Sequence, residues 1–322
     1  MATTTNVSSN YAGTAAGQII GAAFKEGSTL SLGVLTVAEN VNYKMNLRKI
    51  AYTNGTVDYS CGHTPAGAIT LSEKVLTIEK VKNDFDVCKE DFRATWSDPS
   101  MGGSAANPNA PSDIMEAIAV ELLASQAEKI DTDIWTGLAA TSGEFNGLLA
   151  QFAADGSVIK ANNGITALAA ATTEANVEAH LKAALAAIPA SLRRKDLVVA
   201  VSSNVFQAYN FYLISKGIAW NGSTEDKVAA FGRYKITEVN GLPDDTIVCY
   251  EKKNIVFAYG QSEDMMNLEL VDEDSIGLLS GQVRGRLVYG AAIGYYNSAE
   301  IVWLLTTTGK MATVSLGLRR IT

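Results

Sequence analysis

The stretch DIMEAIAVELLASQAEKIDTDIWTG, residues 113–137, carries the strongest structural signal in this chain. Its isoleucine, valine, leucine and alanine residues recur at intervals of three and four, the spacing of one face of an α-helix. Asp113 followed by Glu116 is the pattern of a capping box, and Gly137 is a typical residue just beyond a helix end. We therefore predict one long helix over 113–136, on the order of 35 Å in length at 1.5 Å per residue.

Before this helix lie a loop at 98–111, dense in Gly, Asn and Pro, and a segment at 68–82 in which apolar and charged residues alternate. Alternation with a period of two predicts a β-ribbon that has one apolar and one charged face. Two strands by themselves are marginally stable in water, so we expect a neighbour to cover the apolar face. The apolar positions are Ile69, Leu71, Val75, Leu76, Ile78 and Val81, and the charged positions are Glu73, Lys74, Glu79, Lys80 and Lys82.

The start of the chain has a different composition. Residues 1–24 are uncharged and rich in Ala, Gly, Thr, Ser and Asn, so they have little apolar surface to bury. Residues 28–60 contain short apolar runs at 30–35 and 57–59, separated by the turn signal Asn54-Gly55. We predict a flexible arm that continues as extended chain with pieces of strand.

The second half of the chain mixes helical and strand patterns. The run 196–201 is continuously apolar at strand length, which predicts a strand buried on both faces. Residues 202–204 are Ser, Ser and Asn and are predicted to cap the helix that follows. The remaining predicted elements are helices over 174–188 and 205–215 and strands over 232–236, 246–249, 255–260, 266–271, 283–289 and 301–305.

The composition excludes several classes of protein. A hydrophobic content of 47% and a charged content of 19% in 322 residues describe a chain that folds. The net charge of −8, with a single basic run at 192–195, argues against a nucleic-acid-binding protein, although a mildly acidic wall suits a container for DNA. Cys61, Cys88 and Cys249 are odd in number and widely spaced, which favours reduced thiols in a cytoplasm. The apolar stretch 19–24 is too short to span a bilayer, and no signal peptide is expected.

No recognised catalytic or metal-binding spacing occurs in the sequence. The G-x-S-x-G, P-loop and G-x-G-x-x-G motifs of enzymes are absent. His63 lies two residues after Cys61, but only His180 and two distant cysteines remain to complete a metal site, so a polar loop is the better interpretation. His180 is predicted to flank the apolar stripe of its helix. The sequence therefore predicts no catalytic residue, no cofactor and no metal. Gly281, Gly285, Gly290 and Gly294 are interpreted as bends and close strand approach.

In their order and spacing, these elements resemble the HK97-type major capsid proteins of tailed phages. The segment 69–92 resembles the second strand of the long E-loop and its return to the body. The helix 113–136 and the Glu-Phe-Asn-Gly-Leu-Leu run at 144–149 resemble the spine helix and the turn after it. Residues 188–202 resemble the central strand of the axial domain, and 232–260 resembles the stretch that leaves that domain.

The resemblance implies an α+β fold of the HK97 type. Such a subunit has an N-terminal arm, an extended E-loop hairpin that lies over the adjacent subunit, a peripheral domain with a long spine helix, and an axial α/β domain that points at the axis of a hexamer or pentamer. The corresponding segments are 1–60 for the arm, 61–111 for the E-loop and its return, 112–164 for the peripheral domain, 165–262 for the axial domain, and 263–322 for peripheral-domain strands and the final axial strand.

Two variations within the family are not expected here. Some members carry a scaffolding segment before the arm, and the short chain before the E-loop indicates that a fused scaffold is absent. Others join an E-loop lysine to an asparagine of a neighbour, with a glutamate as base, which needs a neutral buried amine. Lys74, Lys80 and Lys82 are candidate amines, but the segment 275–296 contains no Asn, Asp or Glu. We therefore expect non-covalent contacts between subunits.

The function implied is that of a major capsid protein, not an enzyme, which assembles into hexamers and pentamers of an icosahedral phage head around double-stranded DNA without binding a specific sequence. The implied partners are other copies of the chain, with separate scaffolding, portal and decoration proteins as further candidates and no membrane. The implied location is the virion, after assembly in the cytoplasm of a bacterial host. Deleting residues 66–84 is expected to leave a folded subunit that does not assemble. The residues expected to contact a neighbouring copy are Ile69, Leu71, Lys74, Leu76, Ile78, Lys80, Arg193 and Arg194.

Three alternatives stay open at this point. The same fold forms the shell of an encapsulin-like nanocompartment that packages a cargo enzyme. An α/β enzyme with an unrecognised site could use residues 165–260 as its scaffold. A tail or surface-layer protein would form filaments or sheets instead of closed shells.

Overall fold

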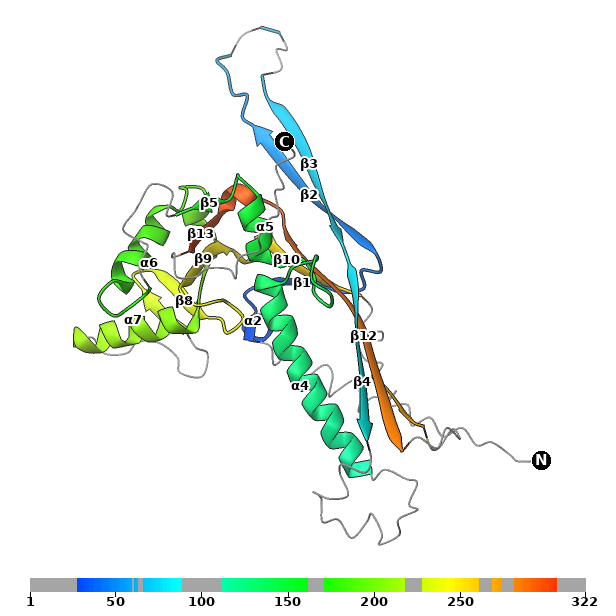
Figure 1. Cartoon of the computed structure of the whole chain (residues 1–322). Coiled ribbons are helices and arrows are strands. Elements are labelled where there is room, and N and C mark those ends of the chain that lie inside the picture. Colours follow the sequence, from blue (N-terminus) through cyan, green and yellow to red (C-terminus); the bar gives the residue numbers. More distant parts are fainter. Residues whose placement is uncertain are drawn as a thin grey trace, which may run out of the picture. The chain divides into compact units, whose positions relative to one another are not determined.

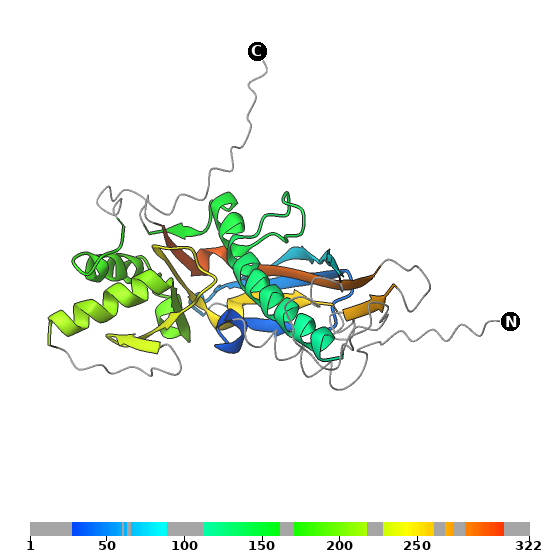
Figure 2. The ribbon, with the colours of Figure 1, turned by 60° about the horizontal axis from the view of Figure 1, so that its bottom comes forward.

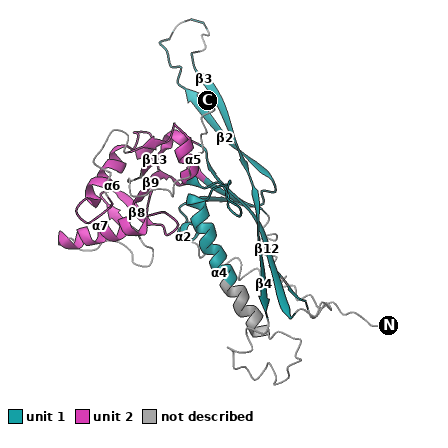
Figure 3. Ribbon diagram, viewed as in Figure 1, with its two compact units in different colours: residues 1–148, 256–296 teal, residues 149–255, 297–322 magenta. Residues whose placement is uncertain are grey.

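The computed structural model describes residues 28–59, 61–62, 66–88, 112–161, 171–217, 228–260, 268–273 and 281–305. They belong to two compact units (Figure 3). Unit 1 comprises 1–148 and 256–296, and unit 2 comprises 149–255 and 297–322.

Unit 1 is built on a sheet whose longest strand is β12 (Gln282–Tyr295), of 14 residues. β4 (Glu79–Cys88) pairs with β12 in antiparallel fashion, from Gln282 opposite Cys88 to Ala291 opposite Glu79. β11 (Leu268–Asp272) pairs with β12 as well. The order of the sheet is β1 (Thr36–Ala38), β10 (Ile255–Tyr259), β12 and β11, with β4 as the additional partner of β12.

A long hairpin extends from this sheet (Figure 1). It consists of β2 (Lys44–Thr53) and β3 (Ala68–Thr77), which pair from Lys44 opposite Thr77 to Thr53 opposite Ala68. Within the described part of the chain these two strands pair only with each other. The chain then continues from β3 through Ile78 into β4. The predicted extended hairpin is confirmed, but the segment 68–82 is one run of chain with two successive partners and not a self-paired ribbon.

The first strand of the hairpin lies where we predicted only an arm with pieces of strand. The segment 30–35 also differs from the prediction, because α2 (Ser28–Ser31) is a short helix there. A tertiary contact explains the helix: the Thr29 N–H donates to Asp131 Oδ1 at 2.9 Å, and Trp135 Nε1 donates to Thr29 Oγ1 at 3.0 Å. Thr29 and Trp135 are both fully buried. Packing against the long helix therefore overrides the strand-like pattern of the sequence.

That long helix is α4 (Ser112–Thr136), of 25 residues, and it confirms the prediction of a helix over 113–136. It runs along the β4–β12 part of the sheet (Figure 2), since Gln126 receives a hydrogen bond from Asn83 of β4 and donates one to the Tyr289 hydroxyl of β12. The side chains of the predicted capping box, Asp113 and Glu116, lie outside the described residues.

Unit 2 contains a second sheet with helices against it. Its central strand β6 (Leu197–Val201) is buried and pairs with β8 (Tyr234–Glu238) in parallel and with β9 (Thr246–Glu251) in antiparallel fashion, as expected for the apolar run at 196–201. The full order is β5 (Ile159–Lys160), β13 (Ile301–Leu305), β9, β6, β8 and β7 (Val228–Phe231). The helices are α5 (Leu148–Ala154), α6 (Val177–Ala186) and α7 (Ser203–Ser215), and short 3-10 turns are η3 (Leu192–Arg194), η4 (Lys252–Asn254) and η5 (Ser298–Glu300).

The two units and the predicted segments divide the chain at different places. β10 pairs with β1 of unit 1, although it falls within the predicted axial segment 165–262. β5 belongs to unit 2, although it falls within the predicted peripheral segment 112–164. Ser202 occupies the N-cap position of α7, but its Oγ accepts no hydrogen bond from the helix backbone and instead donates to Asn204 Oδ1 at 2.7 Å.

Candidate assembly surface

The base of the hairpin is fixed to its own chain. Leu47, Leu76 and Ile78 are buried in one cluster with Val256, Ala258 and Ala292. The Lys74 ammonium lies 3.5 Å from the centre of the Tyr295 ring, a cation–π contact.

Three of the predicted contacts to a neighbouring copy lie at this base and pack within their own chain. Leu76 is 9% exposed and Ile78 is 7% exposed, so neither has much surface left for another molecule. Lys74 already has an aromatic partner within the chain. The expectation that a chain without residues 66–84 still folds no longer follows, because this deletion removes core side chains and part of β4.

The far half of the hairpin has the opposite character. Ile50 lies opposite Leu71, and Tyr52 lies opposite Ile69, so these four side chains share one face of the two-stranded sheet. Their exposed fractions are 70%, 71%, 66% and 69% in that order. Val75 lies on the same face and is 53% exposed. We call these five residues the hairpin face. The exposed Arg48–Glu73 ion pair lies on the same side, between Val75 and the other four residues. Five exposed apolar side chains on one face are nevertheless unusual in contact with water.

The apolar residues of β2 change sides along the strand. Leu47 of the base points to one face, and Ile50 and Tyr52 point to the other, because neighbouring positions on a strand alternate. On the side of the strand pair away from the hairpin face, the outer half carries Lys49, Ala51 and their partners Ser72 and Thr70. For this reason the residues 44–53 show no simple alternation, and the contributions of Ile50 and Tyr52 were missed. A search for two alternating patterns of opposite phase would have found them.

Glycines of β12 let side chains of the preceding strands cross it closely. A methyl group on Gly285 would lie 2.0 Å from Phe85 Cζ, and one on Gly290 would lie 2.8 Å from Ile78 Cγ2. Gly281 has a φ of 67°, a left-handed conformation that favours glycine. The predicted interpretation of these glycines as bends and points of close strand approach is therefore confirmed.

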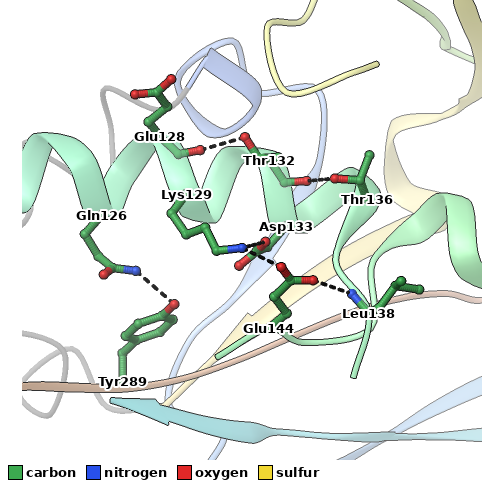
Figure 4. Close-up of polar contacts among 9 residues, drawn as sticks. All are labelled: Gln126, Glu128, Lys129, Thr132, Asp133, Thr136, Leu138, Glu144 and Tyr289. Carbon is green, nitrogen blue, oxygen red and sulfur yellow. Dashed lines mark hydrogen bonds and ion pairs between the residues drawn. The ribbon is translucent and has the colours of Figure 1, made fainter. Parts of the chain in front are cut away.

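The C-terminal end of α4 is held by a polar cluster (Figure 4). Lys129 Nζ lies 2.7 Å from Asp133 Oδ1 and 2.8 Å from Glu144 Oε1, and Glu144 Oε2 accepts the Leu138 N–H at 3.0 Å. Burial raises the pKa of Asp133, whereas the bond from Lys129 lowers the pKa of Glu144. The cluster ties the helix to the turn at 138–147, which is a structural role.

The face of the sheet that carries Arg284 and Arg286 is charged. Arg286 Nε donates to Asp84 Oδ1 at 2.7 Å, and Lys82 Nζ donates to Asp84 Oδ2 at 2.6 Å. These two cations hold the pKa of Asp84 below its usual value. Arg284 Nη1 lies 2.6 Å from Glu273. The cations and carboxylates of this face therefore largely neutralise one another.

The basic run at 192–195 lies in unit 2, on and just after η3. Arg193 Nε donates to the Ile188 carbonyl at 3.1 Å, which places its guanidinium near the end of α6. Lys195 Nζ lies 2.8 Å from Glu251 and 2.7 Å from Glu300. Arg194 is exposed, and no ion pair involves it among the residues that the structure describes. Of the two predicted contact residues in this run, Arg194 thus has the freer side chain.

His180 is a core residue and not the flank residue predicted from the sequence. It is 1% exposed, and its Nδ1 lies 3.0 Å from Thr172 Oγ1. Asp245 Oδ1 accepts the Thr172 N–H at 2.7 Å and the Asn204 side-chain amide at 2.8 Å. Burial lowers the pKa of His180, and the Asp245 carboxylate opposes this effect. The network joins the segment before α6, the start of α7 and the turn before β9.

No group of three or more potential metal ligands occurs among the described residues. Cys61 is exposed, and His63 lies outside the described residues. No helix in the described part of the chain is long and apolar enough to cross a membrane.

Comparison with known proteins gives a result for the fold alone. No protein-family model and no curated protein matches the chain. Among solved structures, the capsid of a native GTA particle superposes with a TM-score of 0.59 at 12% identity, over 87% of this chain and 90% of that one. A structure from Gordonia phage Cozz gives a TM-score of 0.55 at 10% identity, over 87% and 86%. A virus-like particle from Pyrococcus furiosus gives 0.51 at 11% identity, over 89% and 96%.

These structures cover nearly the whole chain and not one of its units alone. The long hairpin, the long helix and the second α/β unit are the elements on which the resemblance to HK97-type capsid proteins was drawn. The chain therefore has the HK97-type capsid fold, and the predicted α+β fold class is confirmed.

Proposed function

We propose that this chain is the major capsid protein of a tailed phage and that many copies assemble into a closed icosahedral shell around double-stranded DNA. The hairpin face carries the proposal. It is apolar, it lies on a two-stranded sheet, and most of its surface is exposed in the single chain. A pair of strands with such a face is stabilised when another molecule covers it, and in a shell that molecule is a second copy.

The work of such a protein is assembly and not catalysis. Ile69 and Leu71, with Ile50 and Tyr52 added from β2, are the apolar contacts, and Lys80 and Arg194 are charged contacts with exposed side chains. A specific interface buries about 1,600 Å² in total, and each subunit of a shell makes several. The contacts are non-covalent, and the shell encloses DNA without reading its sequence. Hexamers and pentamers are the building blocks, with separate scaffolding, portal and decoration proteins as partners and the virion as the final location.

Sedimentation velocity of the purified chain over a range of concentrations tests this proposal. Assembly from many weak contacts predicts a threshold concentration above which large closed particles appear. A single species of 34.1 kDa at every concentration would contradict it.

One observation supports a second candidate, the shell of an encapsulin-like compartment. The fold is shared with a virus-like particle from Pyrococcus furiosus as well as with the capsid of a GTA particle and a structure from a Gordonia phage. The contents of particles isolated from the native source separate the two functions. A phage head contains DNA and absorbs strongly at 260 nm, whereas a compartment contains a stoichiometric cargo protein.

A further inference from the structure

Unit 1 contains a cavity of about 420 Å³ at one end of the charged face. This volume lies within the usual range of binding pockets, about 300–1,000 Å³. Its walls combine apolar side chains with a few charged ones. The lining residues are Asn42, Ile78, Lys80, Gly260, Glu269, Arg286, Val288, Tyr289 and Gly290.

Lys80 gives the cavity an unbalanced positive charge. Arg286 is bonded to Asp84 and lies opposite Glu269 on the neighbouring strand, so its charge is compensated. Lys80 is exposed, and it has no ion-pair partner in the described ranges of the chain. A carboxylate entering beside Lys80 would therefore complete a pair without displacing an existing one.

The cavity also has room for a side chain. Gly260 and Gly290 lie side by side in its lining, joined by a hydrogen bond of 3.1 Å from the Gly260 N–H to the Gly290 carbonyl. A methyl group placed on Gly260 would meet nothing within 4 Å. The space above Gly260 is therefore open to a group from outside, beside the apolar surfaces of Ile78 and Val288.

The tip of the hairpin carries side chains whose chemistry matches that of the cavity. Val57, Asp58 and Tyr59 follow a turn in which the Thr56 N–H donates to Asn54 Oδ1 at 3.1 Å. Val57 is 63% exposed and Tyr59 is 94% exposed. This segment combines two apolar side chains and one carboxylate. The cavity combines apolar walls with the Lys80 ammonium, for which the described residues offer no ion-pair partner.

The tip of a chain cannot reach the cavity of the same chain. The hairpin base adjoins the cavity, because Ile78 lines it and its N–H donates to the Tyr43 carbonyl at 3.0 Å. β2 and β3 are ten residues each, and strands of this length hold the tip roughly 30 Å from the base at about 3.3 Å per residue. Any hairpin tip in the cavity must come from another copy.

We propose that the cavity beside Lys80 receives the hairpin tip of a second copy, with Asp58 paired to Lys80 and Tyr59 or Val57 against the apolar wall. The inference rests on the proposed shell function. That function already has a second copy covering the hairpin face, and the inference adds a binding site for the hairpin tip. It makes each hairpin a connector that is anchored at its base in one subunit and at its tip in another.

Exchange of the two charges tests the proposal. Asp58→Lys and Lys80→Glu should each raise the threshold concentration for assembly about tenfold, because each places like charges together at the contact. The double variant should return to within about threefold of the wild-type threshold. Lys49→Glu makes the same change in net charge as Lys80→Glu but lies on the side of the hairpin away from the hairpin face, and it should leave the threshold unchanged.

A filled cavity provides an independent variant. Gly260→Val places methyl groups in open space, so the melting temperature of the free subunit should stay within about 2 °C while the threshold rises. If the single variants assemble like wild type, or if the double variant does not recover, the docking of the tip is refuted and the shell function stands. If the wild-type chain forms no particles at any concentration, both proposals are refuted.

Discussion

Replacing Ile50 and Leu71 together by threonine separates the hairpin's contribution to assembly from its contribution to the stability of the free subunit. Threonine is β-branched, which favours a strand, but it removes most of the apolar surface. Both residues are about 70% exposed, so the free subunit loses little when they change. Their cross-strand pairing places both changes at one spot on the hairpin face.

The expected effect on assembly follows from the area that remains to be buried. Complete burial of a leucine or isoleucine contributes about 1.5–3 kcal/mol, and about 70% of each side chain is available for a partner. Allowing for the methyl group that threonine retains, the pair contributes about 2 kcal/mol to each contact. This corresponds to about a 30-fold weaker association at each contact.

The same exchange at the base of the hairpin is the matched control. Leu47→Thr with Leu76→Thr replaces one aliphatic residue by threonine on each of the same two strands, but these side chains are 2% and 9% exposed. Loss of buried leucine surface costs several kcal/mol, so we expect the free subunit to melt at least about 5 °C lower. The Ile50/Leu71 variant should melt within about 2 °C of wild type.

Two measurements check both variants: differential scanning fluorimetry below the assembly threshold, and light scattering above it. The reasoning is refuted if the Ile50/Leu71 variant assembles at the wild-type threshold. It is equally refuted if that variant lowers the melting temperature as much as the Leu47/Leu76 variant does.

Three further changes test the account of the individual units. Gly285→Val should destabilise unit 1 by about 1–3 kcal/mol because the new side chain overlaps the Phe85 ring, and denaturant titration measures this loss. Burial lowers the pKa of His180 in the folded chain below the ordinary histidine value of 6.5. Below about pH 6.5, His180 therefore binds a proton more readily in the unfolded chain than in the folded chain. Melting temperature should therefore fall as pH drops from about 6.5 to 5, with a shallower fall in His180→Gln. Lys195→Met leaves two carboxylates without their shared cation and should cost about 1 kcal/mol, measured by urea unfolding at low salt.

Elements with a regular period could be predicted from the sequence. The long helix over 113–136 and the central strand at 196–201 agree with the structure because their own patterns match their environments. The glycines of β12 were also interpreted correctly, since close strand approach is what a glycine in a strand permits.

The features that escaped prediction depend on contacts between distant residues. α2 is a helix because Thr29 bonds to Asp131 and Trp135, which lie more than a hundred positions away. His180 is buried because Thr172 and its neighbours close over it, which a helical pattern alone does not indicate. No local period reveals either contact.

The first strand of the hairpin, β2, escaped prediction for a different reason. Its base buries Leu47 on one face, whereas its outer half carries the exposed Ile50 and Tyr52 on the other face. The apolar positions therefore follow no single alternation over the whole strand from Lys44 to Thr53. Each half alternates correctly when it is considered by itself. The change of phase marks where contacts within the chain end and where contacts with another copy are proposed to begin.

The most direct test of the central claim is a cryo-electron-microscopy reconstruction of the assembled particle. We predict a closed shell in which Ile50, Tyr52, Ile69 and Leu71 of each hairpin lie within about 4.5 Å of apolar atoms of another copy. A shell in which this face remains open to solvent, or particles that are filaments or flat sheets, would contradict the account.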